Sequence, residues 1–377
     1  MYSLMYKFCL FLCVVIITIS QINLVFSTES TKEQSEKNHL VQLQLKNLIN
    51  FKGFCYSPFR DLGPIGEELA SESLVREDFT ILKQLNITNI RTYGVGLNQI
   101  IIPKIAFEYG INCATGVWIG INNTENINEI EKGLSVANIS SMLIIGNEVL
   151  FKGDLSEAEL IEYINHAKNL TSIPVTTAEP WYTWLDHPDL AKISDKLLIH
   201  IHPFWESSVF IDEPSGPEIL ANYTISIFNQ VQETFPNKEI IITETGWPSD
   251  GRLDCSEETQ KQYYKALIPL LLDNRIKCYT FEAFDEIWKH ELWQGDQNSD
   301  VGPHWGVFKS DRTKKLAIDI FSEWYGGDSS IFCKTTTNTT SQTHQDETPD
   351  IYRNYGFEIY WGLSVVLLIF IKKRIKE

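Results

Sequence analysis

Eight short runs of β-branched and other apolar residues alternate along the chain with longer amphipathic segments. Such runs predict buried strands, and the intervening segments include helix-like stretches that begin with serine and acidic residues. Strands and helices that alternate over about 270 residues match an α/β fold of the (β/α)8 TIM-barrel type. A doubly wound sheet would alternate similarly, but nothing here resembles its glycine-rich phosphate turn. The expected strands are Gly53–Ser57, Asn89–Tyr93, Asn112–Trp118, Met142–Glu148, Pro174–Ala178, Leu197–His202, Glu239–Glu244 and Lys277–Phe284, and clear helices are Ser73–Leu85, Ser156–Leu170 and Ser256–Leu272.

Two of the expected strands end in a glutamate, Glu148 in Ile-Gly-Asn-Glu-Val and Glu244 in Ile-Thr-Glu-Thr-Gly-Trp-Pro. A carboxylate after a buried strand is costly unless it is hydrogen-bonded, paired or functional. In a barrel the carboxyl ends of all strands meet at one end, so both glutamates are expected to line one cleft. Paired carboxylates are the groups that glycoside hydrolysis uses. A structural ion pair with Arg91 is the alternative.

Further polar and aromatic residues fall at the carboxyl ends of the expected strands. Because active sites of barrels form at this end, these residues are candidates for contacts with a substrate or with the two glutamates. Ordinary packing is the alternative for the tryptophans, a core position for His202, simple charge neutralisation for Arg91 and a solvent-facing loop position for Glu179. The candidates are Tyr56, Arg91, Tyr93, Asn147, Glu179, Trp181, His202, Trp205, Trp247, Glu282, Glu286, Trp288, Lys289 and Trp305.

Several motifs, in this order and spacing, resemble glycoside hydrolase family 17, the β-1,3-glucanase family of retaining glycosidases. The likeness covers about Phe51 to Trp324 and favours the fungal and bacterial branch. The motifs are Gly53-Phe54-Cys55-Tyr56-Ser57-Pro58, Asn89-Ile90-Arg91-Thr92-Tyr93, Gly146-Asn147-Glu148-Val149-Leu150, Thr243-Glu244-Thr245-Gly246-Trp247-Pro248-Ser249, Phe281-Glu282-Ala283-Phe284-Asp285-Glu286-Ile287-Trp288-Lys289 and His304-Trp305-Gly306-Val307-Phe308.

The resemblance implies that Glu148 is the acid/base and Glu244 the nucleophile of a double displacement. The two carboxyls should then lie about 5–5.5 Å apart, and burial together with the charge of Glu244 should raise the pKa of Glu148. The resemblance to family 17 also implies that Asn147 binds the sugar 2-hydroxyl, and that Tyr93 and His202 orient Glu244.

The resemblance assigns the remaining candidates to substrate binding. Glu286 and Lys289 look like the supporting pair on the last loop, and Glu282 would contact sugar hydroxyls. Independently of the resemblance, the rings of Trp181, Trp247, Trp288 and Trp305 suit stacking on sugar faces, with ordinary packing as the alternative.

A formal net charge of −17 argues against a nucleic-acid partner, because such proteins carry basic patches, and is compatible with a neutral polysaccharide. The five cysteines after residue 27 show no Cys-x-x-Cys spacing, so no metal is expected. The odd number leaves at least one thiol unpaired within the chain, and Cys55, Cys113 and Cys278 fall inside expected strands as buried thiols. The proposed reaction needs no cofactor.

Both ends of the chain carry targeting signals. Lys7 and the apolar run that follows predict a signal peptide over residues 1–27, with an uncleaved anchor as the alternative. A polar leader covers 28–50, the catalytic domain 51–326 and a Ser/Thr-rich stalk 327–354. Residues 355–371 are expected to span a membrane, with a basic cytoplasmic tail over 372–377.

These signals indicate a type I plasma-membrane protein with an extracellular catalytic domain; another endomembrane or secretion is the alternative. Sequons for N-glycosylation agree with passage through the secretory pathway. They begin at Asn86, Asn122, Asn138, Asn169, Asn222 and Asn338.

The residues together predict a retaining glycosidase that cleaves β-1,3-glucosidic bonds of a β-glucan. A β-1,3-glucanosyltransferase would use the same two glutamates, because only the acceptor, water or sugar, differs. A non-catalytic cell-surface β-glucan receptor is the rival from another class. Residue identity does not distinguish endo from exo action, nor does it define the oligomeric state.

Overall fold

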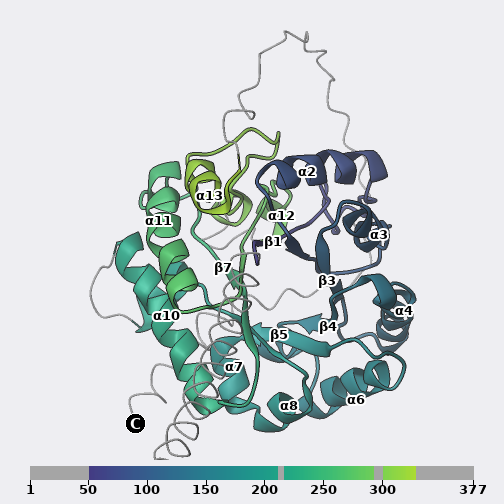
Figure 1. The fold of residues 1–377 in the computed structure, drawn as a ribbon. Helices are drawn as coiled ribbons and strands as arrows, with labels where there is room; N and C mark the ends of the chain where they lie inside the picture. The colour runs from purple at the N-terminus through teal and green to yellow at the C-terminus, as the bar shows by residue number, and fades with distance from the viewer. Residues whose placement is uncertain (1–50, 211–215, 293–299, 328–377) are drawn as a thin grey trace, which may run out of the picture. The chain divides into compact units, whose positions relative to one another are not determined.

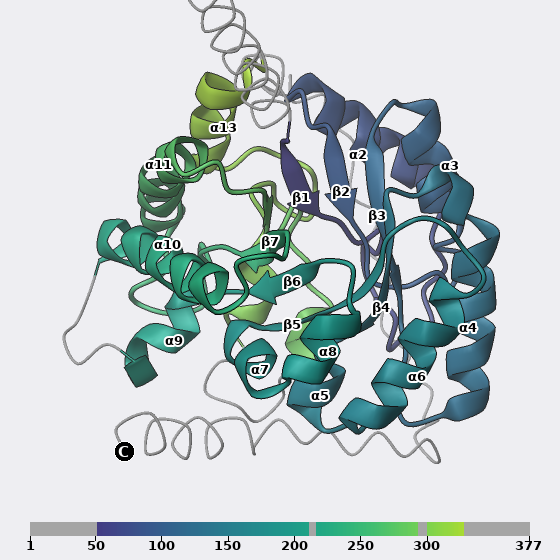
Figure 2. The same ribbon diagram turned by 60° about the horizontal axis from the view of Figure 1, so that its bottom comes forward.

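Eight parallel strands close into a barrel in chain order, with β8 paired back to β1. Figures 1 and 2 show the arrangement of the strands and of the helices around them. The structure is a computed structural model, and it describes residues 51–210, 216–292 and 300–327. The predicted TIM barrel and all eight expected strands are confirmed, with boundaries that differ by a few residues. The strands are β1 Gly53–Cys55, β2 Asn89–Arg91, β3 Asn112–Val117, β4 Met142–Asn147, β5 Val175–Pro180, β6 Leu197–His200, β7 Ile240–Thr245 and β8 Cys278–Thr280.

Helices surround the strands, as Figure 1 shows. Two of them begin at a serine whose side chain and third helical residue cap each other reciprocally, Ser156 before α6 and Ser256 before α11. The helices are α2 Glu72–Gln84, α3 Ile101–Glu108, α4 Asn123–Ser135, α5 Val149–Lys152, α6 Glu157–Lys168, α7 Trp181–Asp186, α8 Pro188–Ile193, α9 Pro203–Phe210, α10 Pro217–Thr234, α11 Glu257–Asp273, α12 Lys289–Leu292 and α13 Ala317–Tyr325, with 3-10 turns η1 Ala137–Ile139 and η2 Gly302–His304.

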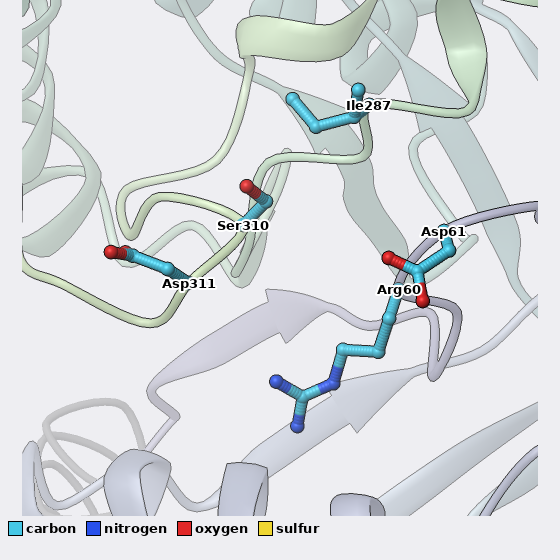
Figure 3. Close-up of a pocket in the computed structure, with 5 residues that line it drawn as sticks. All are labelled: Arg60, Asp61, Ile287, Ser310 and Asp311. Atoms are coloured by element: carbon cyan, nitrogen blue, oxygen red, sulfur yellow. The ribbon is translucent and has the colours of Figure 1, made fainter. Parts of the chain in front are cut away.

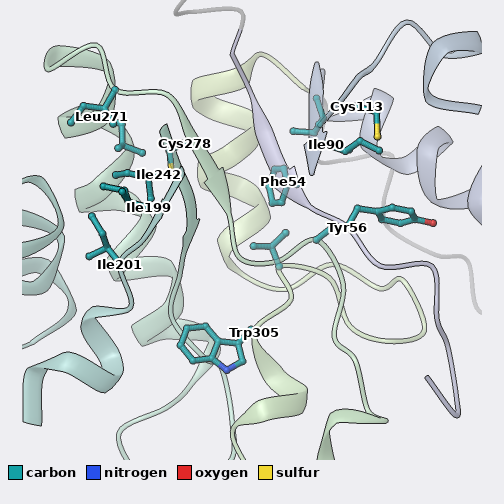
Figure 4. Close-up of a cluster of buried hydrophobic side chains, with 14 of the residues drawn as sticks. Phe54, Tyr56, Ile90, Cys113, Ile199, Ile201, Ile242, Leu271, Cys278 and Trp305 are labelled. Carbon is teal, nitrogen blue, oxygen red and sulfur yellow. The ribbon is translucent and has the colours of Figure 1, made fainter. Parts of the chain in front are cut away.

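The core has two layers because side chains of a strand alternate between its faces. A small cluster that includes Cys55, Ile144 and Ile241 fills the barrel interior. A much larger cluster, part of which Figure 4 shows, packs the outer faces of the strands against the helices. Burial of this outer layer fixes the register of each strand and therefore the positions of the strand ends.

Tyr56 follows β1 with its side chain in the outer layer (Figure 4), so the prediction that it binds substrate is wrong. Its hydroxyl donates to Asp78 Oδ2 at 2.9 Å, and the side chain is buried. Asp78 is itself fully buried on α2 and pairs with Arg312 and Arg60. Side chains alternate along β1, so Phe54 points into the outer layer and Cys55 into the barrel interior. Tyr56 lies two residues after Phe54 and therefore points into the outer layer as well.

The four cysteines in the described part of the chain, Cys55, Cys113, Cys255 and Cys278, are buried and free, and three of them lie in strands as expected. Among the described residues, no helix is both long and apolar enough to cross a bilayer. The expected signal peptide, leader, membrane segment and tail, and the stalk apart from its first residue Gly327, lie outside the described residues, as do Cys333 and Asn338. The other five sequon asparagines are exposed.

We expect Tyr56→Phe to lower the free energy of unfolding by about 1.5 kcal/mol, because it removes a buried hydrogen bond to a charged carboxylate. Urea denaturation of wild type and variant measures this difference. A substrate-binding role would instead raise KM and leave the denaturation midpoint unchanged, and that result would contradict the placement of Tyr56.

Candidate active site

Glu148 and Glu244 meet at the carboxyl end of the barrel, with His200 between them. Ligand atoms of the three side chains all lie within 4.8 Å of one another, so an oxygen of Glu148 and an oxygen of Glu244 are no farther apart than this. Retaining glycosidases hold their two carboxyls about 5–5.5 Å apart, whereas inverting enzymes leave about 6.5–9.5 Å for a water molecule. The spacing therefore suits a retaining mechanism.

An irregular end of β7 sets the direction of the Glu244 side chain. Ile240 and Ile242 of β7 pack in the outer layer, so strict alternation would also turn Glu244 outward. The pairing register of β7 shifts on both sides near this point, against β6 between Ile199 and His200 and against β8 between Ile242 and Thr245. A bulge of this kind redirects the side chains that follow it.

Glu148 lies immediately after β4 in the left-handed backbone region, with φ 58° and ψ 30°. Few residues other than glycine adopt this conformation, so neighbours must stabilise it. The Glu148 amide donates to the Ala178 carbonyl at 2.8 Å. The amides of Leu150 and Phe151, two and three residues later, donate to the Glu179 carboxylate at 3.0 and 3.3 Å.

Glu179 is fully buried on β5, so the alternative that it faces solvent is wrong. Burial, aided by the charge of Glu148, raises the pKa of Glu179 to about 8. Glu179 thus anchors the first turn of α5, and we interpret it as a positioning residue for Glu148.

Glu244 is held by three cationic or imidazole groups. Arg91 on β2 donates from Nη1 to Oε1, His202 Nε2 lies 3.1 Å from Oε2, and His200 Nε2 lies 3.5 Å from Oε1. Although burial raises the pKa of Glu244, the charges of His200 and Arg91 and the bond to His202 outweigh it and hold the pKa well below its ordinary value. A carboxylate that remains ionised is suited to nucleophilic attack.

Glu148 has a different electrostatic environment from the one expected. Burial and the charge of Glu244 raise its pKa, but the hydrogen bond and charge of His200 and the charge of Lys152 lower it, and the net direction is downward. The His200 Nδ1 atom lies 2.9 Å from Glu148 Oε1, and Lys152 Nζ lies 3.9 Å from Oε2. The sequence-based expectation of a raised pKa considered burial and Glu244 alone, and missed His200.

Arg91 connects the nucleophile to Asn147. It is fully buried, and its Nη2 donates to Asn147 Oδ1. Since that oxygen is occupied, the amide nitrogen of Asn147 is the group left to face a sugar hydroxyl. The expected contact of Tyr93 with Glu244 is absent from the described hydrogen bonds: the Tyr93 ring centroid lies 3.9 Å from Arg91 Cζ, and its buried hydroxyl has no partner there.

His202 is fixed from both sides. Its amide donates to Glu206 Oε1 at 2.8 Å, and its ring packs edge-on against Phe281 and Trp305. Glu206 is buried and also accepts from Trp181 Nε1 at 2.9 Å. The sequence left open whether His202 is a core residue or a partner of Glu244, and the structure places it in contact with Glu244.

Glu282, Glu286 and Lys289 come together on the loop that follows β8. Lys289 Nζ donates to both oxygens of Glu282 and pairs with Glu286 Oε2, each at 2.7 Å. Burial and the charge of Glu286 raise the pKa of Glu282 well above its ordinary value. The predicted pair of Glu286 and Lys289 is thus present, with Glu282 as a third member.

Trp181, Trp247, Trp288 and Trp305 are buried, and the structure does not present their faces for stacking on a sugar. Trp181 is tied to Glu206, Trp247 packs against Phe204 and Tyr263, and Trp288 packs against Phe59. The prediction that these four rings bind sugar is therefore corrected to a packing role.

Trp118, which follows β3, is the exposed aromatic residue that the sequence reasoning missed. Its side chain is 47% exposed, and Lys152 Nζ lies 5.0 Å from its ring centroid. Lys152 also contacts the backbone oxygen of Asn147 and faces Glu148. The sequence could have indicated Trp118 as a site residue, because it ends the third expected strand, at the end of the barrel where active sites form.

Glu148, His200 and Glu244 are also the described residues whose ligand atoms are spaced closely enough to hold a metal ion. Each imidazole nitrogen of His200 already faces a carboxylate oxygen, so the geometry is that of direct hydrogen bonding and ion pairing. A separate surface pocket of about 390 Å³ is lined by Arg60, Asp61, Ile287, Ser310 and Asp311 (Figure 3), and none of these is a predicted site residue.

Comparison with known proteins identifies relatives of the barrel. Residues 53–306 match the BtgE/BtgC glycoside hydrolase domain. The chain is 28% identical over 322 residues to the probable glucan endo-1,3-beta-glucosidase btgC of Aspergillus terreus, covering 74% of this chain and 47% of that protein. It is 25% identical to a glucan 1,3-beta-glucosidase of Arthroderma benhamiae, covering 64% of this chain and 83% of that protein. The chain spans about half the length of the Aspergillus relatives it matches.

Solved structures share the fold. The glycoside hydrolase family 17 beta-1,3-glucanosyltransferase from Rhizomucor miehei superposes with a TM-score of 0.59 at 26% identity, covering 71% of this chain and 96% of that chain. An endo-laminarinase from Formosa superposes with a TM-score of 0.62 at 21% identity, covering 78% and 98%, which shows the fold alone. These findings confirm the resemblance to family 17.

The buried carboxyl of Glu179 makes a prediction about stability and pH. Folding raises its pKa to about 8, so its stabilising contribution is complete below the unfolded pKa of about 4.3 and is lost as the pH rises to about 8. Glu179→Gln stays neutral throughout, so wild type should lose more than about 1 kcal/mol of unfolding free energy relative to the variant between pH 5 and pH 8. Urea denaturation at several pH values measures this.

The exposed Glu162→Gln on α6 is the matched control for the loss of one negative charge. A difference between wild type and Glu179→Gln that stays constant with pH would contradict the buried, neutral state of Glu179.

Proposed function

The chain belongs to the BtgE/BtgC glycoside hydrolase family, and from this premise we propose that it cleaves β-1,3-glucosidic bonds of a glucan with retention of configuration. The observation that carries the proposal is the separation of Glu148 and Glu244, whose closest ligand atoms lie within 4.8 Å. A pair this close leaves no room for the water molecule that an inverting enzyme places between substrate and base.

Glu244 acts as nucleophile in the proposed reaction. Arg91, His200 and His202 keep it ionised, and its attack on the anomeric carbon forms a glycosyl-enzyme ester. Glu148 protonates the departing glucosyl oxygen in this step and accepts a proton from the attacking water in the next.

The neighbouring groups would bind the sugar. Asn147 has its amide nitrogen available for the 2-hydroxyl, where a hydrogen bond strengthens as the transition state forms. Glu282 and Lys289 carry the hydrogen-bonding capacity for further hydroxyls, although each already bonds the other. Bound substrate would have to share or replace part of that pairing.

Product analysis on laminaritetraose, a β-1,3-linked glucose tetramer, tests the proposal with the full-chain protein. We expect cleavage with the β-anomer formed first, as seen by proton NMR. Glu244→Gln should lower kcat at least about 10⁴-fold, since it removes the nucleophile, and Glu148→Gln about 10²–10⁴-fold, since it removes acid–base catalysis.

Each outcome has a distinct meaning. Single glucose units indicate exo action, and mixed short oligomers indicate endo action. A folded wild-type protein that binds the tetramer without turning it over would overturn the proposal and favour a β-glucan receptor. An initial α-anomer would contradict retention.

Transfer to a second glucan is the other candidate activity, and Trp118 favours it. This exposed ring lies beside Lys152, which itself faces Glu148, so it flanks the side of the site from which the leaving group departs and an acceptor enters. An aromatic face there would hold an acceptor sugar in place of water. The Rhizomucor miehei relative is named as a glucanosyltransferase.

We expect Trp118→Ala to lower the ratio of products longer than the substrate to hydrolysis products at least about five-fold, because one stacked sugar is lost from the acceptor side. Chromatography of products at high laminaritetraose concentration measures the ratio. Trp324→Ala, which removes a similarly exposed tryptophan from α13, is the matched control. If Trp118→Ala and Trp324→Ala give the same ratio of longer products to hydrolysis products, Trp118 does not bind the acceptor.

We also propose that the protein enters the secretory pathway, is N-glycosylated and is anchored by residues 355–371, with the barrel outside the plasma membrane. The exposure of five sequon asparagines supports this. Asn86 is the least suited of them, because its Nδ2 donates to Tyr325 and Gly326 carbonyls. Endoglycosidase treatment and extraction of membranes with carbonate test the proposal: an unchanged mass, or release without detergent, would contradict it.

A further inference from the structure

His200 touches both carboxylates of the site, and the reaction described above uses it only to keep Glu244 ionised. Its Nδ1 lies 2.9 Å from Glu148 Oε1, and its Nε2 lies 3.5 Å from Glu244 Oε1. The side chain is 1% exposed, so water does not compete for either nitrogen. An imidazole in this position can bond to the acid/base through one nitrogen and interact with the nucleophile through the other.

The geometry around His200 follows from the strands. His200 and Glu244 are register partners on β6 and β7, immediately after the register shift that redirects β7. On the other side, Pro180 of β5 is the register partner of His200, and Glu148 reaches it from the end of β4. Among the described groups, the carboxylates of Glu148 and Glu244 face this imidazole directly, and the ring centroid of His202 lies 6.3 Å away. Further out, Arg91 pairs with Glu244, and Lys152 pairs with Glu148, whose charge also acts on Glu179.

Glu148 must be protonated to act as an acid, yet its surroundings in the free protein favour its ionised form. The proton therefore needs another place close to Glu148. Histidine is the side chain whose ordinary pKa allows it to hold and release a proton near neutral pH.

We propose that His200 holds on Nδ1 the proton that Glu148 delivers to the leaving group, and that it couples this delivery to the charge of Glu244. The inference rests on the proposed retaining mechanism and adds a proton-holding and positioning residue to it. No additional reactant is required, because the proton only changes its place within the site.

Protons are conserved over the two steps. In the first step the Nδ1–H bond of His200 breaks as Glu148 gains the proton on Oε1, and this new O–H bond then breaks as the leaving glucosyl oxygen takes the proton. In the same step the anomeric carbon exchanges its glycosidic bond for the ester bond to Glu244. In the second step Glu148 takes a proton from the attacking water and returns it to Nδ1. The free protein is restored with no net gain or loss of protons.

The position of Nε2 next to Glu244 determines when His200 gives its proton to Glu148. While Glu244 is ionised, its Oε1 lies 3.5 Å from Nε2 and can accept the second N–H of the proposed imidazolium. Formation of the glycosyl ester removes the charge of Glu244, so the imidazolium becomes less stable at the moment when Glu148 needs the proton. Hydrolysis of the ester restores the charge, and His200 regains the proton.

His200→Asn tests the proposal, because the asparagine amide can mimic Nδ1 as a donor to Glu148 but cannot titrate. We expect the alkaline limb of kcat/KM for laminaritetraose to move to lower pH by one unit or more. Activity at pH 7 should fall at least about ten-fold and return to within about three-fold of wild type at acidic pH. With β-laminaribiosyl fluoride, whose leaving group needs little protonation, the loss at pH 7 should be below about three-fold.

His202→Asn is the matched control, because His202 contacts Glu244 but not Glu148 in the described hydrogen bonds. It should reduce kcat/KM for both substrates and leave the alkaline limb where it is in wild type. If His200→Asn instead lowers activity equally at every pH and for both substrates, His200 is merely structural and the inference is overturned.

Two further measurements keep the outcomes separate. Wild-type protein that fails to turn over laminaritetraose overturns the proposed function, whereas active wild type with an unmoved limb in His200→Asn overturns only the role of His200. If the variant does not fold, ¹⁵N NMR of histidine-labelled wild type decides: the inference requires an imidazole protonated on both nitrogens at pH 7. A spectrum in which every imidazole carries a single proton overturns it.

Discussion

Two carboxylates held within 4.8 Å of each other and largely out of water are the constraint on which the rest of the site depends. Like charges this close repel strongly in a medium of low polarity, so they require compensating cations or a shared proton. Arg91 and His202 stabilise the charge of Glu244, Lys152 faces Glu148, and His200 joins the two. To reach this position beside Glu244, Glu148 adopts a left-handed backbone conformation, and Glu179 stabilises the turn that follows it.

The strand pattern and the two catalytic candidates could be predicted from the sequence because both depend on local order. Each strand is built on a short apolar run. Glu148 directly follows β4 and Glu244 lies near the end of β7, at the end of the barrel where active sites form. Tyr56 was misplaced because the prediction used its position at a strand end and ignored the alternation along β1, which turns it toward Asp78.

His200 could not be found in this way, because its contact with Glu244 depends on shifts in strand register. Alternation alone would turn Glu244 outward, and the shifts that β7 makes against β6 and β8 are set by pairing between distant segments. The direction of the Glu148 pKa was predicted wrongly for the same reason, since the imidazole that lowers it was not part of the predicted site. The sequence showed which side chains reach the end of the barrel, but not how each is aimed.

Trapping of the covalent intermediate tests the central claim most directly. A laminaribiosyl fluoride with fluorine at carbon 2 destabilises the transition state for hydrolysis of the ester, so the glycosyl-enzyme should accumulate. Mass spectrometry of the intact protein and of its peptides should then find one laminaribiosyl adduct, on Glu244. No adduct on folded, ligand-binding protein, or an adduct on any residue other than Glu244, would contradict a retaining mechanism with Glu244 as its nucleophile.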